Sequence, residues 1–494
     1  MNARAAKETY VDRLIAHAAS YGARIELQRQ GFIPPPMERQ QILLAAHHLT
    51  QGIRSIDTDI QWLITLRARM SMGSQLAINA SILAPIRRLP QELLSHIFVL
   101  FAMEIDPCMR AHTIRDTVAR VCREWYTVAR STPRLWTYIS STLHDLPPSS
   151  PSRYSAQAAL AGGLPLHLEH GVGDEDYEID DVLLESFLEE LLPYASRWQC
   201  IRLNSSGAFF AAFHVGELIA LEEAQIYVLP PLESGAAGFL AGASGLRRLV
   251  LSYQKMDGDD DEENIITRLS VPAFPQLEDL TVIINTYIDM QPFLSLLRGF
   301  SNSLHNLSVF AYFSDLENAY IPPVELIALE TVMAYNHGYR LLDHLVTPVL
   351  EEIVIEDVYI DDHGDPFPLL SSFSSRAHRY DRLKRLTIID VSFYDVNGAN
   401  SFLQCAPALH WVEELHVRDS VSLMTEEVLQ GLTCASDKAP LLPNLAHLTL
   451  LGSRRPSRAW KVALRAMVAS RKVPRVCASQ TVVALKDIVA DVEY

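Results

Sequence analysis

Residues 246–251, Leu-Arg-Arg-Leu-Val-Leu, are the clearest copy of a short pattern that recurs through the C-terminal two thirds of the chain. The pattern has apolar residues at its first, fourth and sixth positions, and a polar turn follows each copy. Further copies are found at residues 198–203, 277–282, 304–309, 329–334, 350–355, 383–388, 412–417 and 445–450. The long interval between the fourth positions of the first two copies, Ile201 and Leu249, leaves room for a degenerate copy near 221–226.

A repeat length in the twenties and low thirties is typical of a leucine-rich solenoid. Successive side chains of a strand point to opposite faces, so each copy would bury one face and display the other. One repeat cannot bury its apolar face alone, and stacked neighbours bury it together. We therefore expect a parallel sheet on a concave side and helical or irregular returns on a convex side.

The residues between the apolar positions are expected to form a binding surface on the concave side. They include Arg247, Arg248, Val250, Glu278, Asp279, Thr281, Glu351, Glu352, Val354, Lys384, Arg385, Thr387, Glu413, Glu414 and His416. Both signs of charge are mixed, and no arginine cluster suited to a phosphate group stands out.

The repeats depart from the regular leucine-rich pattern, which places Asn three residues after the last strand leucine. Only Asn285 occupies that place, and the other repeats carry residues such as Gln254, Val358 or Ser420 there. Because the repeat lengths also vary, we expect irregular curvature and loops of unequal size.

The N-terminal part is expected to be helical. Residues 3–30 have the pattern of one or two weakly amphipathic helices, which the segment 31–36 ends with three prolines. Over 38–82 apolar residues recur at helical spacing, although Gly52 and Gly73 interrupt it and the spacing is not a strict heptad. We expect a long helix or a helical hairpin over 37–84, packed within the chain rather than in a coiled-coil dimer.

A compact helical unit follows between Pro85 and Ile139. Leu89-Pro90 opens its first helix, because the N–H that proline lacks is not used in a first helical turn. An acidic residue in that turn suits the helix dipole. The apolar residues of this helix are Leu93, Ile97 and Leu100 on one face, with Leu94, Phe98 and Phe101 beside them.

Two further helices complete this unit. The second, over about 112–130, carries apolar residues and Trp125 at helical spacing. In the third, Thr132 is placed as the N-cap and Pro133 as the first helical residue of a short helix that ends near Trp136.

The three-helix pattern resembles the F-box. The resemblance is carried by Leu89-Pro90-x-Glu92-Leu93, Ile97-Phe98, Val121-Cys122-x-x-Trp125 and Ser131-Thr-Pro-x-Leu-Trp136. Together with the preceding helix ending in Ala84–Arg88, it looks like the arrangement common in F-box proteins of mushroom-forming fungi. One departure is the segment Glu104–Arg115, which is longer and more charged than in compact F-boxes.

The resemblance implies docking to the Skp adaptor of a cullin–RING ubiquitin ligase, with the C-terminal domain selecting a protein substrate. The adaptor-interface residues that it implies are Leu89, Pro90, Glu92, Leu93, Ile97 and Trp125. Each of these residues taken alone would also suit a helical core. A three-helix module of this size, however, leaves apolar surface unburied, and such surface usually meets a partner.

Charge and composition limit the other classes of function. Residues 1–150 hold 17 basic and 12 acidic side chains, and the remaining residues hold 25 basic and 47 acidic ones. An acidic C-terminal part argues against nucleic-acid binding, which needs positive surface. No apolar run is long enough for a membrane span, and the charged N-terminus does not resemble a signal peptide. With six widely spaced cysteines, we expect a cytoplasmic or nuclear protein.

No catalytic, cofactor or metal motif is recognisable. Phosphate loops, dinucleotide fingerprints, zinc-protease motifs and serine-nucleophile elbows are missing from the sequence. The acidic run 257–263 has Glu262 where a calcium loop needs glycine, so we interpret it as a solvated loop. The basic amphipathic segment 457–472 could bind membranes or calmodulin, but a helix capping the solenoid is the preferred interpretation.

The sequence therefore predicts an α+β chain. We expect an N-terminal helical extension over 1–36, the long helix or hairpin over 37–84, the F-box over 85–145, a linker over 146–163 and an α/β leucine-rich-repeat-like solenoid with a C-terminal cap over 164–494. The predicted function is that of a non-catalytic substrate receptor that binds the Skp adaptor, the cullin complex and a protein substrate. The alternatives are a scaffold without ubiquitin transfer and an enzyme hidden in the acidic C-terminal half.

Overall fold

The computed structural model describes the chain in fourteen segments. They are residues 9–16, 33–82, 85–105, 113–114, 116–141, 153–171, 181–255, 265–313, 321–359, 364–376, 382–392, 398–420, 423–452 and 457–490. The Pro/Ser cluster at 146–152 and the acidic run at 257–263, both predicted to be loops, lie outside these segments. The chain divides into two compact units, residues 1–93 and 94–494.

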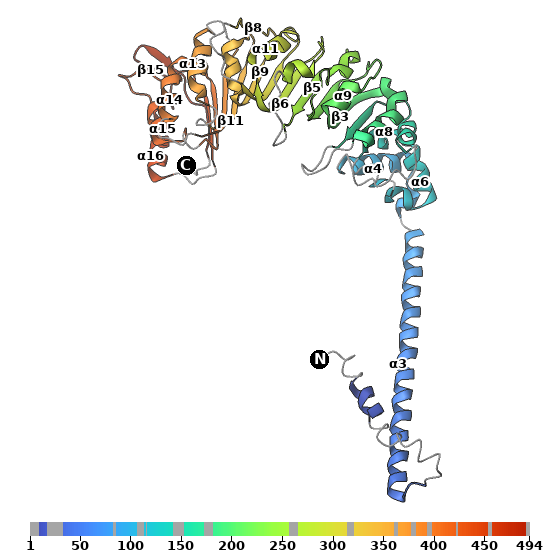
Figure 1. Cartoon of the computed structure of the whole chain (residues 1–494). Helices are drawn as coiled ribbons and strands as arrows, with labels where there is room; N and C mark the ends of the chain where they lie inside the picture. The colour runs from blue at the N-terminus through green and yellow to red at the C-terminus, as the bar shows by residue number, and fades with distance from the viewer. Residues whose placement is uncertain are drawn as a thin grey trace. The chain divides into compact units, whose positions relative to one another are not determined.

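The first unit is dominated by one helix. Helix α3 (Pro36–Ile82) is continuous over 47 residues, and the 3-10 turn η1 (Pro85–Arg88) follows it (Figure 1). A short helix at residues 9–16 lies against α3 at Gly52, where a Cβ added to the glycine would come within 2.9 Å of Leu14 Cδ1. A side chain at position 52 would therefore require the Leu14 side chain to shift.

The helical segment that follows differs from the prediction in one respect. Helix α4 (Gln91–Met103) begins directly after Pro90, as expected. The continuous second helix predicted over 112–130 is wrong, because Cys122 has extended backbone angles (φ −165°, ψ 170°) and separates η2 (Val118–Arg120) from α6 (Arg123–Arg130). A residue with these angles cannot continue a helix.

The third predicted helix is the 3-10 turn η3 (Pro133–Leu135), which begins with proline as expected. Thr132 precedes it but makes no capping bond. Its hydroxyl lies 2.7 Å from the Val128 carbonyl oxygen and 2.9 Å from Ser95 Oγ, so it links α4 to α6 instead.

The main sheet has thirteen strands in chain order, and every pair of neighbours is parallel. The strands are β1 (Tyr138–Ser141), β2 (Leu166–His170), β3 (Trp198–Ser206), β4 (Glu223–Leu229), β5 (Arg248–Tyr253), β6 (Asp279–Ile288), β7 (Asn306–Phe313), β9 (Thr331–Asn336), β11 (Glu352–Tyr359), β12 (Arg385–Ser392), β13 (Glu414–Arg418), β14 (His447–Leu451) and β17 (Asp487–Ala490). This is the mixed α/β, leucine-rich-repeat-like architecture that the sequence predicts.

The register confirms the repeat pattern. The fourth positions of the predicted copies are paired across neighbouring strands, as with Leu249, Leu280 and Leu307. The degenerate copy near 221–226 is β4, whose Ala224 and Ile226 are fully buried. Strands β1, β2 and β17 were not predicted, and they extend the sheet at both ends.

The connections between strands lie along the outer side of the curved sheet, and the strands line its inner side (Figure 1). These connections include α7 (Arg153–Leu160), α8 (Asp181–Leu191), η4 (Leu192–Arg197), α9 (Gly207–Ala212), η5 (Gly238–Gly242), α10 (Ile265–Leu269), α11 (Met290–Arg298), η6 (His337–His344), α13 (Pro366–Arg376), α14 (Gly398–Cys405), η7 (Ala406–Ala408), α15 (Glu426–Leu432) and α16 (Arg458–Ser470). The connections also contain two small two-stranded sheets. One pairs β8 (Val324–Glu325) with β10 (Leu345–Val346), and the other pairs β15 (Arg475–Cys477) with β16 (Gln480–Val482). Helix α7 occupies part of the segment 146–163, for which a linker was expected.

Four repeats share a residue with left-handed backbone angles. Asn336, Asp357, Asp390 and Asp419 all have positive φ, between 47° and 57°. Each lies two residues after the last apolar position of its strand pattern, and Asn and Asp tolerate this conformation better than other side chains. Asp357 and Asp390 lie inside β11 and β12, where the regular pairing skips them, so these two strands share an irregularity at an equivalent place.

At the C-terminal end, α16 packs against α15 through Trp460, Leu464 and Met467, and its side chains there are buried. It is not the last element, because β17 follows and pairs with β14. Arg471, which follows α16, is fully buried, and its guanidinium donates hydrogen bonds to the carbonyls of Leu432, Leu441 and Leu442.

Candidate functional site

Helix α4 has a buried side and an exposed apolar side. Leu94, Phe98 and Ala102 recur at intervals of four and are buried. Ile97 and Leu100 are 39% and 50% exposed, and Phe101 is 40% exposed. An apolar helix side that its own domain does not cover is typical of a surface that binds another protein.

The six residues implied for an adaptor interface differ in exposure. In the first unit Leu89 is half-buried, whereas Pro90, Glu92 and Leu93 are exposed. In the second unit Ile97 is exposed and Trp125 is half-buried. Their role at an interface stays a prediction.

Trp125 also has a part in the core of this helical segment. Its ring lies 5.0 Å from the ring of buried Phe98, centroid to centroid. Nearby in sequence, Trp136 is buried and its indole N–H donates to the Ala129 carbonyl at 2.9 Å. These contacts hold α4, α6 and η3 as one folded segment, so the exposed side of α4 has a fixed support.

The segment that leads into α6 adds exposed apolar groups. Val121 is 49% exposed and Tyr126 is 45% exposed. The Tyr126 hydroxyl accepts a hydrogen bond from Arg130 at 2.7 Å. The sequence analysis assigned Val121 to the motif but not to the adaptor interface. It also left Leu100, Phe101 and Tyr126 out of that interface.

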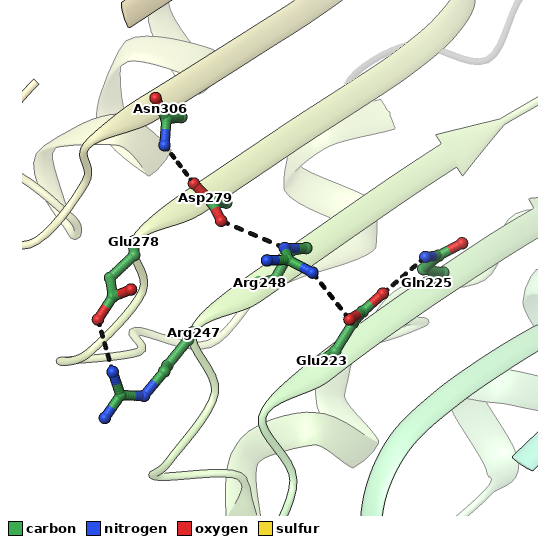
Figure 2. Close-up of polar contacts among 7 residues, drawn as sticks. All are labelled: Glu223, Gln225, Arg247, Arg248, Glu278, Asp279 and Asn306. Atoms are coloured by element: carbon green, nitrogen blue, oxygen red, sulfur yellow. Dashed lines mark hydrogen bonds and ion pairs between the residues drawn. The ribbon is translucent and has the colours of Figure 1, made fainter. Parts of the chain in front are cut away.

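The inner side of the sheet carries a first outward row of residues, one at the start of each strand. In register, these residues include Glu223, Arg248, Asp279, Asn306, Thr331, Glu352, Arg385, Glu414, His447 and Asp487. Figure 2 shows the part around Arg248, whose guanidinium lies 3.0 Å from Glu223 Oε2 and 3.2 Å from Asp279 Oδ2. Asn306 donates in turn to Asp279. Arg247 and Glu278 form a second, separate pair at 2.9 Å (Figure 2).

The same alternation returns further along the first outward row. Arg385 lies between Glu352, at 3.1 Å, and Glu414, at 2.7 Å. His447 Nδ1 lies 3.0 Å from Asp487 Oδ2 on the last strand. The mixed charges predicted on this surface are therefore engaged with one another across neighbouring strands.

The ion pairs shift the pKa values in the directions that mutual stabilisation requires. The hydrogen bond to Asp279 raises the pKa of Arg248, and the hydrogen bond to Glu414 raises that of Arg385. The Arg385 guanidinium lowers the pKa of Glu414 below its ordinary value. Charges already neutralised in this way are poor candidates for binding a free phosphate or carboxylate.

An aromatic cluster lies beyond the first outward row, toward the C-terminal ends of β6, β7 and β9. It consists of Tyr287, Phe310, Tyr312 and Tyr335. Neighbouring ring centroids are 5.7 Å apart for Tyr287 and Tyr312, and 6.2 Å apart for Phe310 and Tyr335. Tyr287 is 61% exposed, and the other three rings are half-buried.

This aromatic cluster is the part of the inner side best suited to a protein ligand. Aromatic side chains combine large apolar area with few rotatable bonds, and they dominate the binding energy of protein interfaces. Sequence reasoning missed all four residues. The available signal was the outward position directly after the last apolar residue of a copy, where Phe310 and Tyr335 stand.

Comparison with protein families gives a match in the helical segment. Residues 86–142 match the family model described as F-box-like. The chain carries an F-box-like domain. Comparison with curated proteins gives no match.

The F-box-like domain covers α4, α6, η3 and β1, so the exposed side of α4 belongs to it. Its last strand, β1, is the first strand of the thirteen-stranded sheet. The domain and the sheet are thus joined without an intervening segment at this point of the chain.

Metal binding and membrane insertion find no support in the part of the chain that the structure describes. Within the described segments, no three His, Cys, Asp or Glu side chains gather as a metal site, and no helix is long and apolar enough to cross a membrane. A hollow near η6 is lined in part by Asp343, His344 and Asp365. Arg376 pairs with Asp343 at 3.0 Å and Ser401 donates to Asp365, so both carboxylates have structural partners.

Proposed function

We propose that this chain is a substrate-recognition subunit of an SCF-type cullin–RING ubiquitin ligase. The F-box-like domain binds the Skp adaptor, and the repeat region binds a protein substrate without catalysing a reaction itself. The observation that carries the proposal is the F-box-like match at residues 86–142, whose helix α4 exposes Ile97, Leu100 and Phe101. This function places the protein in the cytoplasm or nucleus, and the arrangement is similar to that of fungal F-box proteins with leucine-rich repeats.

On the adaptor side, the proposed interface lies on α4, on the two residues before it and around the start of α6. Leu89, Pro90, Glu92, Leu93, Ile97 and Trp125 are its proposed members by family resemblance. Leu100 and Phe101 of α4, Tyr126 of α6 and Val121 just before α6 join them because their side chains are exposed. Burial of such side chains stabilises association by removing apolar surface from water.

On the substrate side, the aromatic cluster is the proposed anchor. The first outward row beside it is internally paired, which leaves shape and aromatic contact as the main means of recognition. Tyr287 contributes the most exposed ring of the cluster. A target segment that buries Tyr287 and Phe310 would gain more than one that contacts the paired charges, because exposed ion pairs contribute little.

The first test is capture of the matching Skp adaptor by the full chain. We expect the wild-type chain to bind the adaptor, and the double variant Leu89→Ala/Pro90→Ala to lose binding while its thermal unfolding is unchanged. Ile327→Ala is a matched control, because Ile327 is 46% exposed and lies in the repeat region. Failure of a folded wild-type chain to bind the adaptor would reject the proposal.

A second test separates a ligase subunit from a scaffold. Proteins captured by the chain in cells should gain ubiquitin when the chain, adaptor, cullin and RING components are combined. The variant Tyr287→Ala/Phe310→Ala should keep the adaptor and lose captured proteins. Captured proteins that are never ubiquitinated by the assembled complex would favour the scaffold function.

A further inference from the structure

Although the apolar spacing over 38–82 as a whole is not a strict heptad, the part of α3 between Arg39 and Arg67 carries a seven-residue repeat, which favours a coiled coil over the packing within the chain that was expected. Its apolar positions alternate at spacings of four and three residues, which is the pattern of a coiled-coil seam. The seam consists of Ile42, Ala46, Leu49, Ile53, Ile56, Ile60 and Leu63. The pattern is difficult to see from the large apolar residues alone. One of its positions is filled by Ala46, and the next positions beyond its two ends are Arg39 and Arg67.

The seam is largely exposed within the first unit. Ile53 is 59% exposed and Leu63 is 56% exposed, and Ile42, Ile56 and Ile60 are also exposed. Leu49 is half-buried near Gly52, where the short helix at 9–16 lies. Among the described residues of this unit, the short helix therefore covers one flank at the N-terminal end, and the side chains from Ile53 to Leu63 on the seam stay exposed.

A helix of this kind needs a partner for stability. Most helical stability in proteins comes from packing of an apolar face, and propensity contributes little. At 1.5 Å per residue the seam is about 33 Å long, and a partner helix of similar length can cover all of it. A seven-residue repeat stays in contact along such a length when two helices supercoil around each other.

A second copy of α3 fits this requirement by its own sequence. One core position of the repeat holds Ala46, Ile53 and Ile60, and the other holds Ile42, Leu49, Ile56 and Leu63, so a second copy in register meets an apolar residue at every one of these levels. The flanking charges also allow this pairing. Two copies in register place Asp57 opposite Gly52 and Asp59 opposite Ile64, so no like charges face each other at these flanking positions, and the arginine pairs at 39 and 67 lie only at the two ends of the seam.

We propose that the protein forms a homodimer through a parallel, in-register coiled coil of α3, with the Ile42–Leu63 seam at its centre. Arg39 and Arg67 mark the ends of the apolar seam and fix its register, as a polar residue at a core position does in other coiled coils. The dimer is independent of adaptor binding, since α3 lies outside the F-box-like domain.

The test is the molar mass of the full chain by light scattering during gel filtration. The wild-type chain should elute with twice the single-chain mass of 55.4 kDa. Ile53→Asp/Ile60→Asp places carboxylates inside the seam and should weaken dimerisation at least about a hundredfold, because unpaired charges are not tolerated there. Leu44→Asp/Trp62→Asp is the matched control, since both residues are exposed on α3 outside the seam and its flanking positions.

A wild-type chain that stays a single copy at micromolar concentration would overturn the proposal, and α3 would then be covered within the chain or by another protein. Equal loss of dimer in both double variants would also overturn it. Cross-linking tests the dimer without the charged variants, which could lose binding through misfolding. Ile42→Cys should form a disulfide-linked dimer under mild oxidation, whereas wild type and Leu44→Cys should not. Retained adaptor binding by Ile53→Asp/Ile60→Asp would keep this test separate from the proposed ligase function.

Discussion

Two residues of α4 allow the proposed adaptor binding to be tested separately from folding. Ile97 is 39% exposed, and Leu94, three residues before it, is fully buried. Complete burial of an isoleucine side chain is worth about 1.5–3 kcal/mol. The exposed part of Ile97 therefore represents about 0.6–1.2 kcal/mol that a partner could still gain. At 1.4 kcal/mol per tenfold, Ile97→Ala should weaken adaptor binding about three- to sevenfold.

Ile97→Asp should have a larger effect, because it places an unpaired carboxylate in a desolvated interface at a cost of several kcal/mol. Because the rest of Ile97 is already covered within the chain, Ile97→Ala should lower the free energy of unfolding by no more than about 1–2 kcal/mol. Leu94→Ala should do the opposite, with a loss of about 2–5 kcal/mol in stability from a buried site.

The measurements are the adaptor dissociation constant by calorimetry and the unfolding midpoint in urea, on the full chain. Ile327→Asp is the matched control, because it places the same charge at an exposed position of the repeat region. It should change neither the dissociation constant nor the unfolding midpoint. The reasoning would be refuted by an Ile97→Asp chain that binds the adaptor with wild-type affinity. It would also be refuted by Ile97→Ala destabilising the chain as much as Leu94→Ala.

Arg471→Met removes buried hydrogen bonds to three carbonyls and should lower the free energy of unfolding in urea by about 3 kcal/mol or more. A decrease below about 1 kcal/mol would contradict the assigned bonds. Glu414 has its pKa lowered below 4.5 by Arg385, so its contribution to stability is complete above that pH and disappears as the pH falls through the folded-state value. The melting-temperature difference between wild type and Glu414→Gln should accordingly shrink as the pH falls below 4.5. Burial raises the pKa of Cys405 to about 12, so maleimide at pH 7.5 should label half-buried Cys122 well before Cys405, and early labelling of Cys405 would contradict its burial.

Much of the solenoid could be predicted because its strands repeat one apolar pattern. Leu249, Leu280 and Leu307 are recognisable in the sequence and are paired in the sheet. The end strands could not be recognised in this way. In β2, Glu169 and His170 are buried polar residues, and β17 begins with exposed Asp487, so neither strand has the expected apolar pattern.

Some local features of the fold also could not be predicted from the apolar pattern. Val354 was expected on the displayed surface but is only 3% exposed, between Met333 and Thr387 of the neighbouring strands. The break at Cys122 depends on backbone angles that helical periodicity does not reveal. The aromatic cluster brings together residues up to 48 positions apart, which only the register of the strands determines.

The alternation of charge along the first outward row restricts how this chain can change length in evolution. Arg385 on β12 separates Glu352 on β11 from Glu414 on β13. Loss of the single repeat that contains β12 would bring those two carboxylates face to face, and duplication of it would set two arginines side by side. Loss or gain of two adjacent repeats would preserve the alternation. In this part of the molecule, pairs of repeats are therefore the units that can be added or removed without electrostatic conflict.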